Sequence, residues 1–482
     1  MNHPPHAHSP ADAPPHALSG PDGRWRALVL LCAAQFMLIV DVTVVNVALP
    51  SIAEDLTLGR SALTWVVAAY SLMFGGLLLL GGRLADGLGR RRAFLAGLGL
   101  FTLASLGCGL AWNGGVLIGA RAVQGMGAAL LSPTAMSIIT TTFHGPERTR
   151  ALGVWGAIGG TGAATGVLFG GALTAGPGWA WVFFVNVPVG AAILLLLPRF
   201  VPATPPAGTL RGLDLPGAAT GTVAAGSLVY GLVRAGDSGW GAAATLVPLT
   251  AALVCAVAFL VIARRVRQPL APLPLLASRP VAAGTLVMLT ASSLLLAAFF
   301  LSSWYLQHRL GFSALKTGLA FLPVAVATIL GAHTAAHLLG RIGSRPTVVA
   351  AFAVTGGGAA LLARLPADAG VATDLLPGFV LLAAGLGAGF VCATTTAMRG
   401  VEHHTAGLVS GIVNTGHELG GALGVALASA IAGSSLTGTT GMAGFHTAFT
   451  ASAIAAAVMA LLALRLVPPG KPDTSDGPVF AH

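Results

Sequence analysis

Apolar stretches of about 20 residues alternate with short polar segments along most of the chain. A helix of that length crosses the roughly 30 Å hydrocarbon core of a bilayer, so each stretch predicts one transmembrane helix. The stretches cover residues 27–49, 61–82, 93–112, 115–142, 151–174, 181–198, 214–234, 243–263, 281–303, 315–338, 347–364, 375–398, 406–433 and 445–467. The pattern therefore predicts an all-α integral membrane protein with fourteen spans.

Composition supports a lipid environment for most of the chain. Of the 482 residues, 55% are hydrophobic and only 8% are charged, whereas a soluble domain carries about 25% charged residues. The four cysteines are far apart, and each lies in an apolar stretch, where cysteine behaves as a small hydrophobic residue. We therefore expect neither a disulfide framework nor a metal site.

The distribution of positive charge predicts the orientation of the chain. The formal net charge is +10, but the basic residues are not clustered on any soluble segment, so we expect no nucleic-acid partner. If the N-terminus is cytoplasmic, 19 of the 25 Lys and Arg residues fall in segments on the cytoplasmic side. The positive-inside rule then favours an even number of spans, with both termini on the cytoplasmic side of the cell (inner) membrane.

The chain divides into five segments. A faint internal repeat supports two related six-helix halves, because Gly340–Arg345 follows the tenth stretch much as Gly82–Arg90 follows the second. We predict a disordered tail (1–26), a first six-helix bundle (27–198), a linker with two inserted transmembrane helices (199–280), a second six-helix bundle (281–467) and a second tail (468–482).

The source of energy and the class of activity follow from what these segments contain. No loop is large enough to fold as a catalytic domain, and the sequence has no G-x-x-x-x-G-K-[ST] phosphate-binding loop. An enzyme within the membrane would need several polar groups at one depth, yet the only acids away from the ends of the stretches are Asp41 and Glu418. We therefore expect a transporter driven by an ion gradient, rather than an enzyme or an ATP-driven pump.

Two charged residues inside the first and fourth stretches are candidates for proton coupling. Asp41 lies eight residues before the end of its stretch and Arg121 about six after the start of its own. At 1.5 Å per residue both lie roughly 9–12 Å deep, so a contact between them is geometrically feasible. A carboxyl group within a span is costly unless it is protonated, paired or facing water, which makes it a functional candidate. We hypothesise that protonation of Asp41 releases this pair; the alternative is a permanent ion pair between the two helices.

The thirteenth stretch contains a second acid, Glu418, near the middle of the membrane. Glu418 is a candidate either for binding a cationic substrate or for carrying a second proton; the alternative is a neutral, hydrogen-bonded acid. Asn414 and His417 lie beside it in the same stretch. The polar residues Gln35, Asn46 and Gln124 fall within other apolar stretches. We predict that all six line a substrate cavity.

Several motifs of the chain resemble those of the major facilitator superfamily, specifically its fourteen-span drug:proton antiporter branch. The most specific lies between the second and third stretches and reads Gly82-Arg83-Leu84-Ala85-Asp86-Gly87-Leu88-Gly89-Arg90-Arg91-Arg92. The others are Asp41–Pro50 in the first stretch, Arg121-Ala122-Val123-Gln124-Gly125 in the fourth, and Trp179–Pro188 at the start of the sixth, where Ala180 replaces the usual arginine. The resemblance covers nearly the whole chain after residue 26. It implies a fold of two six-helix bundles with two additional inserted helices.

The resemblance also implies roles for particular residues. The loop residues Gly82, Arg83, Asp86, Gly89, Arg90 and Arg91 would latch the cytoplasmic face between conformations, where the alternative is a loop that only orients the chain. Asp86 is free to pair with a nearby arginine or to lie at a helix N-terminus. The fifth stretch resembles the antiporter signature through Gly162, Gly166, Gly170 and Gly171, but Val167 stands where the branch has proline.

The sequence as a whole predicts a secondary active transporter that works by alternating access. We expect proton-coupled efflux, that is antiport, of amphipathic small molecules such as drugs or antibiotics. Asp41, Arg121 and Glu418 would couple the proton, with the proton gradient in place of a cofactor, and we expect a monomer in the bilayer. A symporter or uniporter of a small metabolite is the alternative, and Val167 is the feature that leaves it open.

Overall fold

The computed structural model describes residues 20–203, 213–366, 370–402, 405–436 and 441–471, and within these ranges it contains helices but no strands. Of the predicted tails, only residues 20–26 and 468–471 fall in these ranges, together with all but residues 204–212 of the predicted linker. The helices are α1 (Gly20–Asp55), α2 (Arg60–Leu88), α3 (Arg90–Gly109), α4 (Gly114–Thr142), α5 (Gly145–Ala175), α6 (Trp181–Phe184), α7 (Asn186–Phe200), α8 (Leu215–Ser238), α9 (Ala243–Arg265), α10 (Leu273–Leu276), α11 (Arg279–Trp304), α12 (Ala314–Ile342), α13 (Ser344–Leu362), α14 (Leu376–Ala397), α15 (Ala406–Leu436) and α16 (Ala443–Leu466), with π-helical turns η2 (Tyr305–Arg309) and η3 (Val371–Leu375).

The helices correspond closely to the predicted apolar stretches. Each stretch coincides with one long helix, except that α6 and α7 share residues 181–198. Several helices extend beyond the apolar stretch, because a helix continues through polar residues until a cap or a breaker ends it. In particular, α1 begins at Gly20, so residues 20–26 are helical and do not belong to a disordered tail.

Eleven helical segments within the described residues are long and apolar enough to span a membrane. The helices α5, α8 and α15 are not among these eleven segments, although each is more than 20 residues long. Glycine and polar residues lower the mean hydropathy of α8. The all-helical membrane class is thus confirmed, and the number of fourteen spans stays a prediction.

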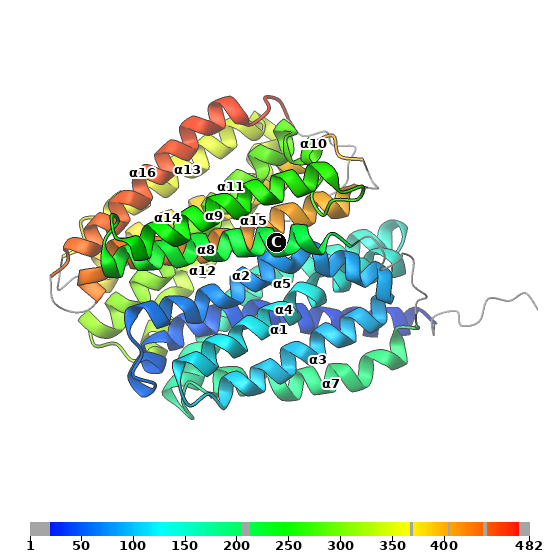
Figure 1. The fold of residues 1–482 in the computed structure, drawn as a ribbon, viewed down its shortest axis with the longest axis horizontal. Helices are drawn as coiled ribbons and strands as arrows, with labels where there is room; N and C mark the ends of the chain where they lie inside the picture. Colours follow the sequence, from blue (N-terminus) through cyan, green and yellow to red (C-terminus); the bar gives the residue numbers. More distant parts are fainter. Residues whose placement is uncertain (1–19, 204–212, 367–369, 403–404, 437–440, 472–482) are drawn as a thin grey trace, which may run out of the picture.

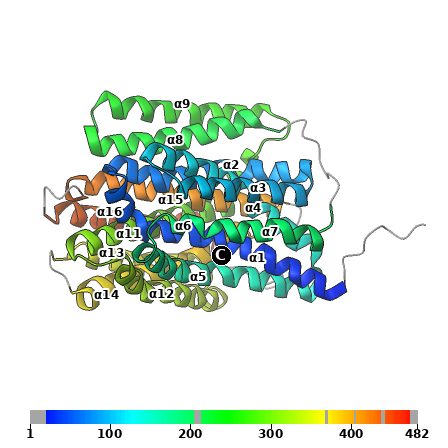
Figure 2. The ribbon, with the colours of Figure 1, turned by 90° about the horizontal axis from the view of Figure 1, so that it is seen from below.

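The long helices form two groups. Helices α1–α7 pack mainly on one another, and helices α11–α16 do the same. The groups meet where α2 packs against α15 and where α5 packs against α12. Figure 1 shows the first group, from blue to blue-green, below most of the second group, from yellow-green to red. Helices α8 and α9 lie side by side outside the bundle, next to α2 (Figure 2).

The two ends of the bundle differ in how the groups are joined. We call the end where α1 begins and α16 ends the proximal end, and the opposite end, between α1 and α2, the distal end (Figure 1). Toward the distal end, the Ser303 hydroxyl of α11 donates to the carbonyl of Asn46 (2.9 Å). Gln307 Nε2 donates to the carbonyl of Val47 (3.0 Å). These bonds connect α1 of the first group to α11 and η2 of the second.

The proximal end has hydrogen bonds within each group instead. Arg91 of α3 donates to the carbonyl of Val201, which follows α7, over 3.2 Å. In the second group, Arg345 Nε donates to the carbonyl of Val467 (2.9 Å). The described structure is therefore fastened between the groups at its distal end, while its proximal arginines stabilise each group separately.

Candidate functional site

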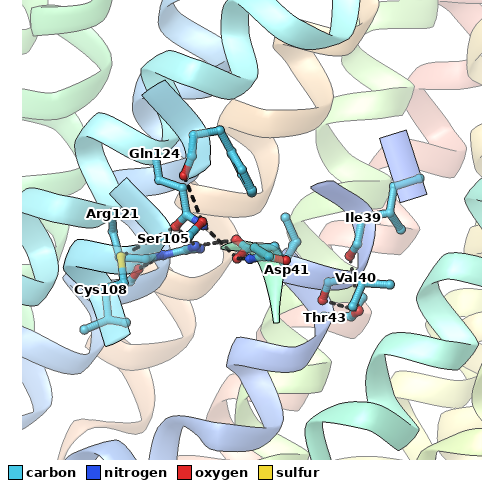
Figure 3. A network of polar contacts seen from close by, with 12 residues as sticks. Ile39, Val40, Asp41, Thr43, Ser105, Cys108, Arg121 and Gln124 are labelled. Atoms are coloured by element: carbon cyan, nitrogen blue, oxygen red, sulfur yellow. Dashed lines mark hydrogen bonds and ion pairs between the residues drawn. The ribbon is translucent and has the colours of Figure 1, made fainter. Parts of the chain in front are cut away.

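Asp41 lies in the middle of α1 and is almost completely buried, with 1% of its surface exposed. Its Oδ2 accepts a hydrogen bond from Arg121 Nη1 of α4 over 2.5 Å (Figure 3). Its Oδ1 accepts from Gln124 Nε2 (2.8 Å) and from Asn186 Nδ2 of α7 (2.9 Å). The predicted contact between Asp41 and Arg121 is therefore present. Three donors from two helices surround one buried carboxylate.

Arg121 is also buried, with 1% of its surface exposed, and it has partners besides Asp41. Its Nε donates to the carbonyl of Val66 in α2 (3.2 Å), and its Nη1 donates to Gln124 Oε1 (2.6 Å). Its guanidinium carbon lies 4.3 Å from the centre of the Tyr70 ring, a cation–π geometry. Gln124 in turn bonds Ser105 Oγ of α3 (2.8 Å). The positive charge is thus held by α2 and α4 independently of the carboxylate.

The spacing of the α4 motif explains this geometry. Arg121 and Gln124 are three residues apart, so they share one face of the helix. Gly125 follows on the side that faces α2, where an added Cβ would approach Met73 Cβ to 3.1 Å and would overlap the carbonyl of Tyr70. The motif therefore combines two polar side chains that face α1 with a glycine that lets α2 approach closely.

The cluster includes residues that the sequence did not single out for this site. They are Tyr70, Ser105, Cys108 and Asn186. Asn186 was visible only as part of the Trp179–Pro188 motif. A polar residue within an apolar stretch was the available signal, but nothing in the sequence placed it opposite Asp41.

The other polar residues predicted on α1 have different surroundings. Asn46 Nδ2 donates to the carbonyl of Val42 in its own helix (2.9 Å). Among the described residues, Asn46 Oδ1 and Gln35 Oε1 are buried and have no hydrogen-bond partner. Both oxygens therefore remain available to accept a hydrogen bond.

Glu418 lies on α15 at the contact with α2. A Cβ added at Gly75 of α2 would lie 2.7 Å from Glu418 Cβ, so the glycine makes room for this side chain. The Glu418 side chain is 12% exposed, and its Oε1 lies 3.3 Å from His417 Nδ1. His417 is 43% exposed and its ring packs 5.6 Å from that of Phe390 in α14. Asn414 is half-buried one turn before Glu418. Among the described residues, the polar partner of the Glu418 carboxylate is His417, and no hydrogen bond joins it to the Asp41 cluster.

The predicted loop between the second and third stretches is reduced to one residue. Helix α2 ends at Leu88 and α3 begins at Arg90, and Gly89 between them has φ = 87°, a conformation that favours glycine. Gly82, Arg83 and Asp86 belong to the last turns of α2. Asp86 is exposed and forms no ion pair within the described ranges, so neither contact considered for it is formed.

The glycines of α5 face two different helices. Cβ atoms added at Gly162 and Gly170 would lie 3.0 Å from Ile39 Cγ2 and from Val44 Cα of α1, and at Gly166 the Cβ would overlap Thr43 Oγ1. At Gly171 the Cβ would lie 2.8 Å from Leu315 Cα of α12. This pattern brings α5 close to α1, which carries Asp41, and to α12 of the second group.

A cavity of about 650 Å³ lies at the distal end of the first group, apart from these residues. Its walls include Glu54, Asp55 and Trp179, and Trp179 Nε1 donates to Asp55 Oδ2 (2.7 Å). None of the predicted substrate-cavity residues lines it.

Comparison with known proteins agrees with this architecture. Residues 31–425 match the family model described as Major Facilitator Superfamily. The chain is 42% identical to the puromycin resistance protein of Streptomyces alboniger over 420 residues, covering 86% of this chain and 83% of that protein. It is 39% identical to the cephamycin export protein of Amycolatopsis lactamdurans over 448 residues, covering 92% of both.

A solved structure shares the fold at low identity. The crystal structure of an auto-inhibited peptide transporter of the POT family superposes with a TM-score of 0.66 at 18% identity, covering 95% of this chain and 100% of that one. The family match and the two relatives identify a multi-pass membrane transporter of small molecules, not an enzyme. The chain belongs to the major facilitator superfamily.

Proposed function

We propose that this transporter exports amphipathic small molecules of the antibiotic or drug type in exchange for protons. The observation that carries the proposal is the buried carboxylate of Asp41, which is held by one cation and two amide donors. Such a group binds a proton without leaving its site. The names of the relatives, which concern resistance to puromycin and export of cephamycin, support this substrate class and this direction.

The hydrogen bonds suggest how a proton changes the structure. Protonation of Asp41 removes its negative charge and weakens the bond to Arg121. Arg121 keeps Val66, Gln124 and the Tyr70 ring as partners, so it stays on α2 and α4. Asp41 is then less tightly bound, and α1 is released from α4. Because α1 also bonds α11 toward the distal end, its release reaches the contact between the two groups.

Glu418 is proposed as the second coupling residue, on the other side of the transport pathway. Its partly exposed carboxylate lies where α2 meets α15, so a cationic substrate or a second proton bound there acts directly on the contact between the groups. Gln35, Asn46, Gln124, Asn414 and His417 are the proposed polar contacts of the substrate. The unpartnered oxygens of Gln35 and Asn46 support this assignment for those two residues.

The proposed orientation has fourteen spans, with the proximal end and both termini on the cytoplasmic side of the cell membrane. The proximal arginines Arg91, Arg345 and Arg399 support this orientation through the positive-inside rule. With this orientation the distal fastening means that the structure faces inward. The segments 27–198 and 281–467 would move as two units, the Gly82–Arg91 segment would latch the cytoplasmic face in the opposite state, and a monomer would suffice.

Proteoliposomes with an internal pH dye test the antiport assignment. Wild type is compared with Asp41→Asn under an imposed proton gradient while amphiphilic cations and neutral antibiotics are added. We expect wild type to move protons against the substrate flux and Asp41→Asn to lose this movement. Asp374→Asn, whose carboxylate bonds only Gly370 and Thr373 among its described contacts, is the control and should behave as wild type.

The same experiment discriminates the alternative transport modes. Substrate flux without proton movement in wild type would indicate a uniporter. Protons that move in the same direction as the substrate would indicate a symporter, which Val167 in place of proline leaves as the second candidate. Either result would overturn antiport.

A further inference from the structure

Arg60, the first residue of α2, is a cation at the distal end whose side chain is mostly buried. Only 8% of its side chain is exposed, and a buried guanidinium is costly unless it is paired and hydrogen-bonded. Its Nη2 donates to the carboxylate of Asp237 in α8. Its Nη1 lies 2.5 Å from the carbonyl oxygen and 3.5 Å from Oγ of Ser429 in α15. One side chain therefore connects the first group, the second group and the inserted helices.

Neighbouring residues complete this connection. Thr64 lies one turn along α2, and its Oγ1 is 2.8 Å from Ser429 Oγ, with both residues fully buried. A Cβ added at Gly236 of α8 would overlap the guanidinium of Arg60, and one at Gly433 of α15 would lie 3.4 Å from Nη1. Both partner helices thus carry glycine where the arginine needs room.

The inserted helices lie where this connection can act on both groups. Helix α8 packs against α2 and against α15, so it covers the line along which the two groups meet (Figure 2). A small buried cluster fills this three-helix contact and consists of Ala68, Val229, Leu232, Val233, Ala422 and Ala426. Helix α9 packs mainly on α8, and only 11% of its apolar segment is buried.

At the proximal end of the inserted pair, Asp214 joins the start of α8 to the segment after α9. This buried carboxylate caps α8 by accepting from Gly217 N (2.8 Å) and also accepts from Leu270 N after α9 (3.3 Å). The two helices are therefore tied to each other at the proximal end, and α8 is tied to both groups at the distal end.

We propose that Arg60, Asp237 and Ser429 form a distal latch, through which the inserted helices hold the distal face closed. The inference rests on the alternating access of the proposed function, in which opening of the distal face separates α2 from α15. That separation breaks the bonds from Arg60 and Thr64 to Ser429. The Arg60–Asp237 ion pair holds the guanidinium where it reaches Ser429. Helix α8 therefore stabilises the closed state, and loss of the Asp237 carboxylate weakens that state.

Hydrogen–deuterium exchange of the full chain in lipid nanodiscs tests the latch. We expect Arg60→Gln and Asp237→Asn to raise deuterium uptake in distal peptides of α2, α8 and α15. The expected size is about a fivefold shift in the ratio of distal-open to distal-closed molecules, the low end of couplings between sites. Arg60→Lys keeps the charge but replaces the two terminal nitrogens of the guanidinium with one. Its distal deuterium uptake should therefore lie between those of wild type and Arg60→Gln.

Arg234→Gln is the matched control. Arg234 lies on α8, close to Asp237, but its guanidinium bonds Tyr230 at the surface. This variant should exchange as wild type does. If Arg60→Gln does not fold, Asp237→Asn alone decides, since it leaves the arginine in place. Distal uptake equal to that of Arg234→Gln in the folded latch variants would overturn the latch. Exchange needs neither substrate nor a proton gradient, so this failure is distinguishable from a failure of antiport.

Discussion

Replacement of Asn186 by alanine should lower the stability of the protein, and the loss should depend on the charge of Asp41. The variant removes one of the three donors to the buried Asp41 carboxylate, a bond of 2.9 Å. A hydrogen bond to a charged group contributes about 1.5–3 kcal/mol, so the free energy of unfolding should fall by about that amount. In the Asp41→Asn background the acceptor is neutral, and the same replacement should cost only about 0.5–1.5 kcal/mol.

The assay is chemical unfolding of the purified protein, with each replacement made in wild type and in Asp41→Asn. Asn113→Ala is the control, because Asn113 caps α4 by accepting from Val116 N and does not contact Asp41. The control should lose the same stability in both backgrounds. If Asn186→Ala also loses the same stability in both backgrounds, the reasoning is refuted. In that case the Asn186 bond does not depend on the charge of Asp41.

Three further predictions concern packing, the ion pair and the second acid. Gly166→Ala places a Cβ against α1 and should lower stability by about 1–3 kcal/mol; thermal unfolding should show no such loss for Gly82→Ala, where the Cβ meets open space. Arg121→Leu leaves the carboxylate of Asp41 uncompensated and should cost about 3–5 kcal/mol; adding Asp41→Asn should restore part of the loss, and additive losses in the double-mutant cycle would contradict direct coupling. Glu418→Gln should weaken binding of cationic substrates about tenfold or more, as expected for a lost charged hydrogen bond, and leave the binding of neutral substrates unchanged. Equal losses of affinity for cationic and neutral substrates in a binding titration would exclude a role in charge recognition.

Much of the fold was predictable from hydrophobicity alone. The predicted stretches coincide with the helices because lipid requires each crossing segment to satisfy its own backbone hydrogen bonds. The ends were less predictable. Helix α1 starts at Gly20, since hydrophobicity detects the part in lipid and not the polar turns that continue the helix.

Contacts within the site were predictable where two residues lie at the same depth in the membrane. Asp41 and Arg121 were paired from their distances to the ends of their stretches, and the structure contains this bond. Asn186 was missed because depth does not specify which face of α7 turns toward α1. The Arg60–Asp237 bond joins residues 177 positions apart, and no local pattern connects them.

The placement of α8 has a consequence for how lipid-soluble molecules reach the transporter. With α8 over the α2–α15 contact, that side of the molecule is sealed from the surrounding acyl chains by an additional layer of protein. On the other side, helices α5 and α12 carry exposed apolar side chains, including Phe169 and Leu319. We therefore expect a molecule dissolved in the bilayer to approach from the α5–α12 side rather than from the side that α8 covers.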